Sequence, residues 1–180
     1  MSQLATAVDL IHSVSAGRAL TLVGIGGRGG SGKSTLAGAI EASLPDVQVV
    51  TTDAFWNGSQ FDLPRLRTEV VEVLLRGRTA TYEAWDWANR AAAGQRALVP
   101  FGVVVIEGVC ALHEMFRHDL DVRIWVDAAY ELRLSRGVAR DGEASRATWT
   151  EVWMPSEDAY VARDNPIPCA QLVIDGAIPY

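Results

Sequence analysis

The chain has 180 residues, a length that fits one domain, and 49% of them are hydrophobic, which is enough for a substantial core. Its formal net charge of −6 argues against a general nucleic-acid binder, because such proteins normally carry a basic surface. No apolar run reaches the roughly 18 residues of a membrane span, and Met1–Ala16 lacks the basic start of a secretory signal. We therefore expect a cytoplasmic protein whose partners include neither a membrane nor a nucleic acid.

Short apolar runs alternate with helical patterns along the sequence. In chain order, the pattern predicts a helix over Met1–Ala16, a strand over Ala19–Ile25, a helix over Lys33–Leu44, a strand over Val47–Thr52, a helix over Pro64–Arg76, strands over Val103–Ile106 and Val122–Val126, helices over Ala128–Arg140 and Thr148–Arg163, and a strand over Leu172–Ile174. The stretch Gly77–Ala97 fits neither pattern. Runs such as VVVI are apolar on both faces, so they predict a parallel sheet covered by helices and hence a three-layer α/β fold.

One glycine-rich motif carries most of the functional information. The stretch Gly27–Ser34 (GRGGSGKS) matches the pattern G-x-x-x-x-G-K-[ST] in full, after a predicted strand and before a predicted helix. Glycines let such a loop fold around an anion with its N–H groups pointing inward, and the following helix adds its positive end. The motif predicts that ATP and Mg²⁺ bind here, with Lys33 on the β- and γ-phosphates and Ser34 on the metal. The predicted loop contacts are Gly27, Gly29, Gly30, Ser31, Gly32, Lys33, Ser34 and Thr35.

Two acidic residues follow predicted strands. Asp53 stands after the second strand and Glu107 after the third, at the sheet edge where parallel α/β folds bind ligands. We interpret Asp53 as a base that accepts the proton of a substrate hydroxyl, and Glu107 as a carboxylate that holds Mg²⁺. The alternative for Asp53 is a turn or helix cap, and the alternative for Glu107 is a cap of the next helix.

Three arginines share one face of a predicted helix. Arg133, Arg136 and Arg140 are spaced by three and four residues. One interpretation is a lid, over about residues 133–147, that closes on the transferring phosphoryl group. On that interpretation Arg136 is catalytic, and Arg133 and Arg140 bind the nucleotide. The alternative is a solvated helix face paired with neighbouring acids.

Aromatic and polar residues gather between the second and third predicted strands. Such a mixture suits a pocket for a flat ring, although aromatics are also ordinary core residues. The candidate substrate residues are Trp56, Phe61, Asp62, Tyr82, Trp85, Asp86 and Arg90, with Trp87 in the same group.

These motifs together resemble a known family. The segments GGRGGSGKST, TTDAFW, FDLPR, VVVIEG and DVRIWVDAAYELRLSRGVARDG occur in the order found in the uridine kinase and phosphoribulokinase group of P-loop kinases, from about residue 20 to residue 175. The resemblance implies a five-stranded parallel sheet with a lid after its fourth strand. It implies that Asp53 is the base, that Trp56 lies beside the substrate, and that Asp62 binds a sugar hydroxyl.

The chain departs from that family at two places. Uridine kinases usually carry a His that reads the pyrimidine, and the matching stretch from Trp85 to Arg90 has none. Gly137 stands where another lid arginine is common.

From these residues we predict a kinase that uses Mg·ATP to phosphorylate a hydroxyl of a small molecule, with a nucleoside as the leading acceptor. The alternatives are a kinase for another metabolite, such as a sugar phosphate or a pantothenate-like compound, and a nucleotide-binding regulatory protein. The chain lacks the N-K-x-D-like motif of GTPases. Related kinases are often oligomeric, so a homo-oligomer is compatible with the resemblance.

Overall fold

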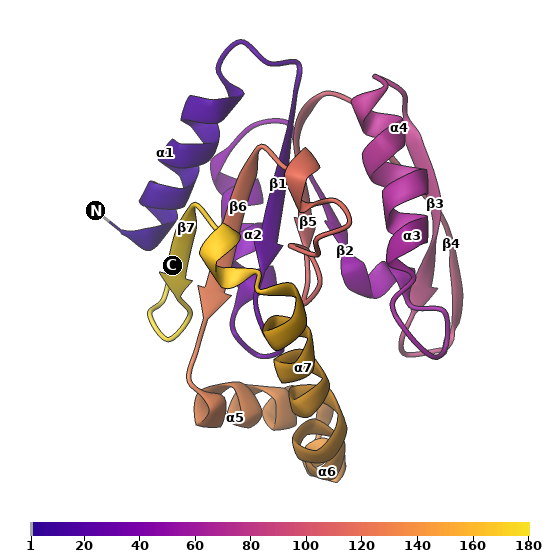
Figure 1. The fold of residues 1–180 in the computed structure, drawn as a ribbon, viewed down its shortest axis with the longest axis vertical. Coiled ribbons are helices and arrows are strands. Elements are labelled where there is room, and N and C mark those ends of the chain that lie inside the picture. The colour runs from indigo at the N-terminus through magenta and orange to yellow at the C-terminus, as the bar shows by residue number, and fades with distance from the viewer. Residues whose placement is uncertain (1) are drawn as a thin grey trace.

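A parallel sheet forms the centre of the molecule in the computed structural model, which describes residues 2–180 (Figure 1). Within those residues the strands are β1 (Leu20–Gly26), β2 (Val47–Thr51), β3 (Ala80–Asp86), β4 (Ala91–Leu98), β5 (Gly102–Glu107), β6 (Val122–Asp127) and β7 (Leu172–Asp175). Five of them pair in the order β2-β5-β1-β6-β7, and every pair is parallel. The predicted five-stranded parallel α/β fold is therefore confirmed.

The helices lie where the apolar periodicity predicts them. They are α1 (Gln3–Ser15), α2 (Lys33–Ser43), α3 (Leu63–Leu66), α4 (Glu72–Leu75), α5 (Tyr130–Asp141), α6 (Arg146–Thr148) and α7 (Met154–Asp164). Two π-helical turns, Arg67–Val71 and Trp149–Trp153, join α3 to α4 and α6 to α7. Each pair thus forms one continuous helical segment, as the sequence predicts, although apolar spacing does not reveal the π turns. Met1, which belongs to the first predicted helix, lies outside the described residues.

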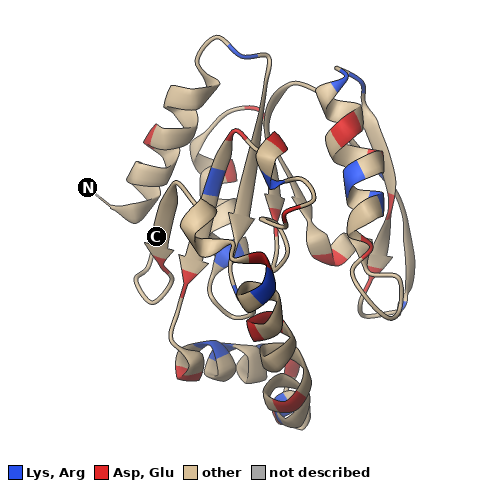
Figure 2. Cartoon of the chain, in the orientation of Figure 1, with Lys and Arg blue, Asp and Glu red and all other residues tan. Residues whose placement is uncertain are grey.

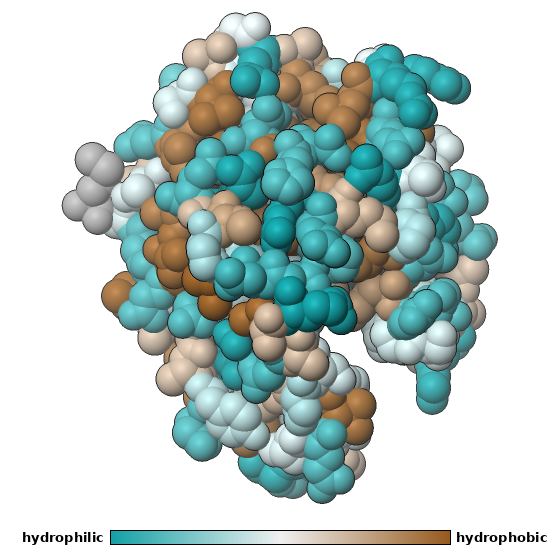
Figure 3. All heavy atoms as spheres, in the orientation of Figure 1, coloured by the Kyte–Doolittle hydropathy of each residue, from teal (hydrophilic) through white to brown (hydrophobic). Residues whose placement is uncertain are grey.

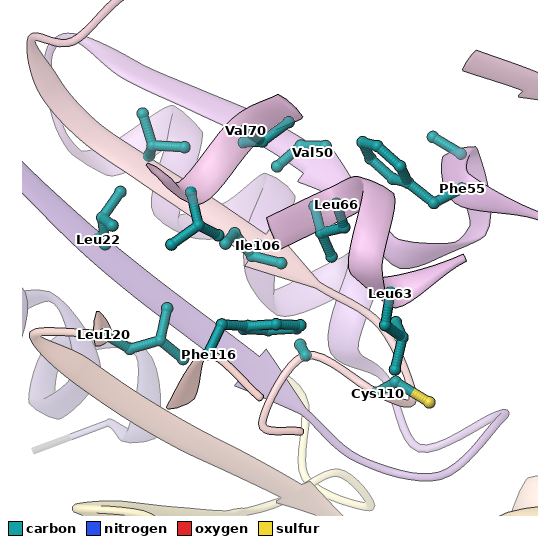
Figure 4. Close-up of a cluster of buried hydrophobic side chains, with 14 of the residues drawn as sticks. Leu22, Val50, Phe55, Leu63, Leu66, Val70, Ile106, Cys110, Phe116 and Leu120 are labelled. Carbon is teal, nitrogen blue, oxygen red and sulfur yellow. The ribbon is translucent and has the colours of Figure 1, made fainter. Parts of the chain in front are cut away.

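Strand β5 shows why the sheet needs a helical layer on both faces. Val103 and Val105 pack with the cluster that α1 and α2 contribute, whereas Val104 and Ile106 pack with the cluster on the opposite face. The second cluster takes residues from α3, α4 and the segment after β5, and Figure 4 shows its side chains interlocking around Ile106. The alternation follows from the period of two along a strand. The apolar run VVVI is therefore buried on both sides.

The stretch that fits no pattern in the sequence is a β-hairpin. Strands β3 and β4 pair antiparallel beside α3 and α4, with an irregular register between Glu83 and Trp85 (Figure 1). Arg90 takes a positive φ of 51° just before β4 begins. Alternation is weak because most of β4 is exposed, which explains why the sequence gives no clear strand signal. In the part of the chain described, no helix is long and apolar enough to cross a membrane.

Candidate functional site

The phosphate loop connects the end of β1 to the start of α2, as predicted. Gly27 and Gly32 take φ values of 152° and 109°, which disfavour other residues, and a Cβ at Gly27 would lie 2.4 Å from the carbonyl oxygen of Val126. Lys33 is the first residue of α2. The loop backbone and the N-terminus of α2 therefore form the kind of concavity that binds phosphate.

The Lys33 side chain is buried at the centre of a group of acids. Its ammonium donates a hydrogen bond to the carbonyl oxygen of Arg28, with Nζ and O 2.9 Å apart. Burial lowers the pKa of Lys33, while the nearby carboxylates of Glu107, Glu157 and Asp53 act in the opposite direction. The side chain is therefore held close to the loop by hydrogen bonding and by surrounding negative charge.

Ser34 and Glu107 form an oxygen-rich pair beside Lys33. The Ser34 hydroxyl donates to Oε1 of Glu107 at 3.1 Å, and Glu107 lies opposite Thr51 where β5 pairs with β2. Burial raises the pKa of Glu107, and the charge of Lys33 lowers it. A hydroxyl and one carboxylate suit Mg²⁺, which prefers oxygen ligands and usually keeps several waters or phosphate oxygens. Across residues 2–180, no group of three or more His, Cys, Asp or Glu side chains offers an all-protein metal site.

Asp53 stands at the same edge of the sheet. It lies in a 3₁₀ turn, Thr52–Phe55, directly after β2, and its N–H donates to the Thr51 hydroxyl at 3.1 Å. The side chain is accessible to solvent, yet the surrounding protein removes enough water to raise its pKa; Lys33 and Arg140 oppose that shift. The predicted base, lysine and magnesium carboxylate are therefore brought within electrostatic reach of one another.

The three arginines that the sequence predicts to form a lid contact different partners from α5. Arg133 is buried and its Nη1 donates to Glu157 at 3.2 Å. Arg136 donates to the carbonyl oxygens of Gly30 and Gly176, at 3.4 and 2.9 Å. Arg140 pairs with Asp141 and lies close enough to Asp53 to affect its pKa. Figure 2 shows that α5 and α7 carry both basic and acidic residues at the end of the sheet where the phosphate loop lies.

Aromatic rings line the site on the side of the hairpin. The centroid of Trp56 lies 5.1 Å from Trp87 and 5.3 Å from Phe61, and the Trp87 indole N–H donates to the carbonyl oxygen of Asp53 at 3.2 Å. A small cavity of about 150 Å³ opens beside them, and Trp56, Trp85 and Arg65 are among its lining residues. Figure 3 shows an open notch between the lobe of α5–α7 and the edge formed by the hairpin.

Other predicted substrate residues have local structural partners. Asp62 caps α3 by accepting from the N–H of Arg65 at 3.1 Å. Asp86 holds the hairpin turn through the N–H groups of Ala88 and Asn89, and hydrogen bonds from Asn89 lower its pKa. Tyr82 is buried and stacks on Phe55 with centroids 5.0 Å apart. Their role in binding substrate stays a prediction.

Two residues at the phosphate loop were not predicted from sequence. Glu157 on α7 accepts the N–H of Gly29 at 2.9 Å, and Trp149 packs so closely that a Cβ on Gly29 would lie 2.9 Å from its ring. Nothing in the sequence connects these residues to the loop, because both belong to a helical segment more than a hundred residues away. The π-helical turn Trp149–Trp153 and the packing of Trp149 on Gly29 are seen only in the folded chain, so the sequence alone could not indicate that these residues reach the loop.

The sheet order, the phosphate loop and the carboxylate at the end of β5 define a P-loop nucleotide-binding protein of the α/β class. Comparison with known proteins narrows that class.

No established family profile matches the chain. A uridine kinase of Alkaliphilus metalliredigens is 28% identical over 150 residues, which is 72% of this chain and 72% of that protein. The Arabidopsis thaliana protein named inorganic pyrophosphatase TTM2 is 32% identical over 134 residues, covering 68% of this chain but 20% of the plant protein. A solved structure described as a possible uridine kinase from Bacillus stearothermophilus matches with a TM-score of 0.71 at 18% identity, covering 97% of this chain and 100% of that one.

The chain is similar in sequence to uridine kinases and shares the fold of a possible uridine kinase, and this similarity supports a kinase of the phosphotransferase class. The similarity covers most of this chain but only a fifth of the plant relative.

Proposed function

We propose that this protein transfers the γ-phosphate of ATP, with Mg²⁺, to a hydroxyl group of a small molecule, and that a nucleoside is the leading acceptor. The observation that carries the proposal is the convergence of Lys33, Asp53 and Glu107 at one edge of the sheet, where Lys33 lowers the pKa of both carboxylates and both carboxylates raise the pKa of Lys33. A protein that only bound a nucleotide would need the lysine and the metal carboxylate. It would not need a second acid with a raised pKa at the open side of the site.

Each side chain has a distinct role in this proposal. Lys33 binds the β- and γ-phosphates, and Asp53 orients the acceptor hydroxyl and takes its proton as the phosphoryl group leaves ATP. The lid arginine Arg136, together with Arg133 and Arg140, neutralises charge on the transferring group. Ser34 and Glu107 would hold Mg²⁺, which supplies charge neutralisation on the phosphate oxygens. Positioning and electrostatics account for most of the catalysis in this class.

The rings of Trp56, Phe61 and Trp87 support an acceptor with a flat face, because aromatic walls bind planar rings. The uridine kinase relatives support a nucleoside. The stretch from Trp85 to Arg90 lacks the expected His, and this favours testing other acceptors as well. The closest alternatives are a sugar phosphate and a pantothenate-like compound.

The test is ADP release from Mg·ATP across a panel of nucleosides, sugars, sugar phosphates and pantothenate. Wild-type protein and Lys33→Ala are assayed side by side, so that a contaminating kinase is recognised by activity in both. We expect stimulation by uridine or cytidine. Stimulation by a non-nucleoside alone would support the kinase activity but exclude a nucleoside as the acceptor. ATP binding without stimulation by any acceptor would favour a nucleotide-binding regulatory protein.

A further inference from the structure

A buried carboxylate on α7 contacts the phosphate loop directly. Glu157 is 8% exposed, and its Oε1 accepts the N–H of Gly29 at 2.9 Å. Its Oε2 accepts from Nη1 of Arg133 at 3.2 Å, and Arg133 is only 4% exposed. A single carboxylate therefore connects α7, the lid helix α5 and the loop that binds phosphate.

The contact has the chemistry of an anion bound to the loop. An N–H group of a glycine-rich loop and a guanidinium are the donors that bind phosphate oxygens in proteins. Burial raises the pKa of Glu157, and the Gly29 N–H, Lys33, Arg133 and Arg28 all act against that rise because they stabilise the charged form. The Glu157 carboxylate is therefore stabilised by N–H donors and positive charges of the same kind as those that stabilise a bound phosphate group.

The same region holds more donors than Glu157 satisfies. Nε of Arg133 and the hydroxyl of Ser31 are buried and have no hydrogen-bond partner among the described residues. Gly30 lies so close to the lid that a Cβ there would be 2.5 Å from the carbonyl oxygen of Arg133. The helix α5 is therefore already docked on the loop, and a donor of Arg133 and the hydroxyl of the loop residue Ser31 are each left without a hydrogen-bond partner among the described residues.

We propose that Glu157 is a positioning residue that holds α5 and α7 on the phosphate loop by taking the place of a γ-phosphate oxygen, and that ATP displaces it whereas ADP does not. The inference rests on the proposed binding of ATP to this loop. Its physical basis is that a γ-phosphate adds negative charge next to a buried carboxylate, and like charges brought together in an enclosed site repel strongly. ADP lacks the group that competes with Glu157.

The direct test compares the affinity of ADP with that of the non-hydrolysable analogue AMP-PNP, both with Mg²⁺, by calorimetry. The variants are Glu157→Gln, which removes the charge but keeps the shape, and Asp158→Asn as the matched control. Asp158 is the next residue of α7 and pairs with Arg28 of the same loop at 2.7 Å, but it is largely exposed. We expect Glu157→Gln to raise the preference for AMP-PNP over ADP about tenfold, with ADP affinity nearly unchanged. Asp158→Asn should shift the preference by less than about twofold.

An unchanged or reduced preference in Glu157→Gln would overturn the inference. A second measurement uses only the wild-type protein. Hydrogen exchange of peptides over residues 149–160 should be faster with AMP-PNP bound than with ADP bound, because displacement of Glu157 frees α7. Equal protection in the two complexes would overturn the inference as well. Failure of both nucleotides to bind would instead contradict the proposed function, so the two failures are distinguishable.

Discussion

The indole ring of Trp149 packs directly on Gly137 of the lid helix, where a Cβ atom would lie 2.4 Å from the ring. The ring is buried, and its N–H donates to Asp141 at 3.0 Å. A larger side chain at residue 137 would collide with the indole ring, so this contact accounts for the glycine at that position. The same ring also packs on Gly29 of the phosphate loop, so Trp149 connects α5 with the loop.

Gly137→Ala should therefore destabilise the protein, although alanine is the better helix former. We expect a loss of about 1–3 kcal/mol in the free energy of unfolding, because the added methyl group overpacks the contact with Trp149. The matched control is Gly38→Ala in α2, where a Cβ meets nothing within 4 Å. That variant should gain about 0.5–1 kcal/mol from helix propensity. Urea unfolding measures the free energy of unfolding of both variants. A Gly137→Ala variant as stable as Gly38→Ala would contradict the close packing of Trp149 on Gly137.

The sheet could be predicted from sequence because its strands are apolar on both faces. The run VVVI of β5 and the motif Gly27–Ser34 each carry a strong local signal, and both lie where they are expected. The hairpin β3–β4 could not be assigned, because its exposed strand lacks alternation. Local patterns describe an element well only when one face of it is consistently buried.

The candidate site was predictable only in part, for a related reason. Asp53 and Glu107 follow apolar strands, so the parallel topology alone brings them to one edge. Glu157 reaches the same place from α7, through a tertiary contact that no spacing in the sequence encodes. Asp62 and Asp86 match the family pattern or the aromatic cluster, and the structure shows that each also has a capping or turn role. Residue type alone does not separate these two uses of an aspartate.

Asp53→Asn should preserve nucleotide binding and reduce turnover by about 10²-fold or more, because the amide cannot accept the acceptor's proton. Binding is measured by calorimetry with AMP-PNP and turnover by ADP release. An Asp53→Asn variant with full activity would remove Asp53 from the proposed mechanism.

The pH dependence of turnover gives an independent test of Asp53. Partial burial raises its pKa, so the charged base is lost at a higher pH than for an exposed aspartate as the solution is acidified. Turnover should therefore fall as the pH is lowered through the raised pKa of Asp53. The residual turnover of Asp53→Asn should not show this decrease.

The raised pKa of Asp53 also affects the pH dependence of stability. The stability that this group contributes is present below its pKa in the unfolded state and is lost as the pH rises through its pKa in the folded state. Asp53→Asn should therefore be at least as stable as wild type at pH 8 in thermal unfolding.

Removal of the proposed magnesium ligands should change the metal requirement more than the protein's stability. We expect Ser34→Ala to raise the Mg²⁺ concentration needed for half-maximal AMP-PNP binding by about tenfold or more. The nearby control is Thr35→Ser, which keeps a hydroxyl at the next residue of α2. An Mg²⁺ dependence in Ser34→Ala equal to that of wild type would contradict the proposed site.

Trp87 connects the proposed acceptor site to the proposed base, and its substitution should affect the acceptor but not the nucleotide. The indole packs against Trp56 and donates its N–H to the carbonyl oxygen of Asp53. Trp87→Ala removes both contacts, so we expect KM for the acceptor to rise about tenfold, in line with the loss of one aromatic contact, while AMP-PNP affinity stays within about twofold. Trp87→Phe keeps a ring but lacks the N–H, so it should recover most of the acceptor affinity if stacking dominates. Equal losses in Trp87→Phe and Trp87→Ala would show that the hydrogen bond to Asp53 matters more than the ring, whereas a KM unchanged in both would place the acceptor elsewhere.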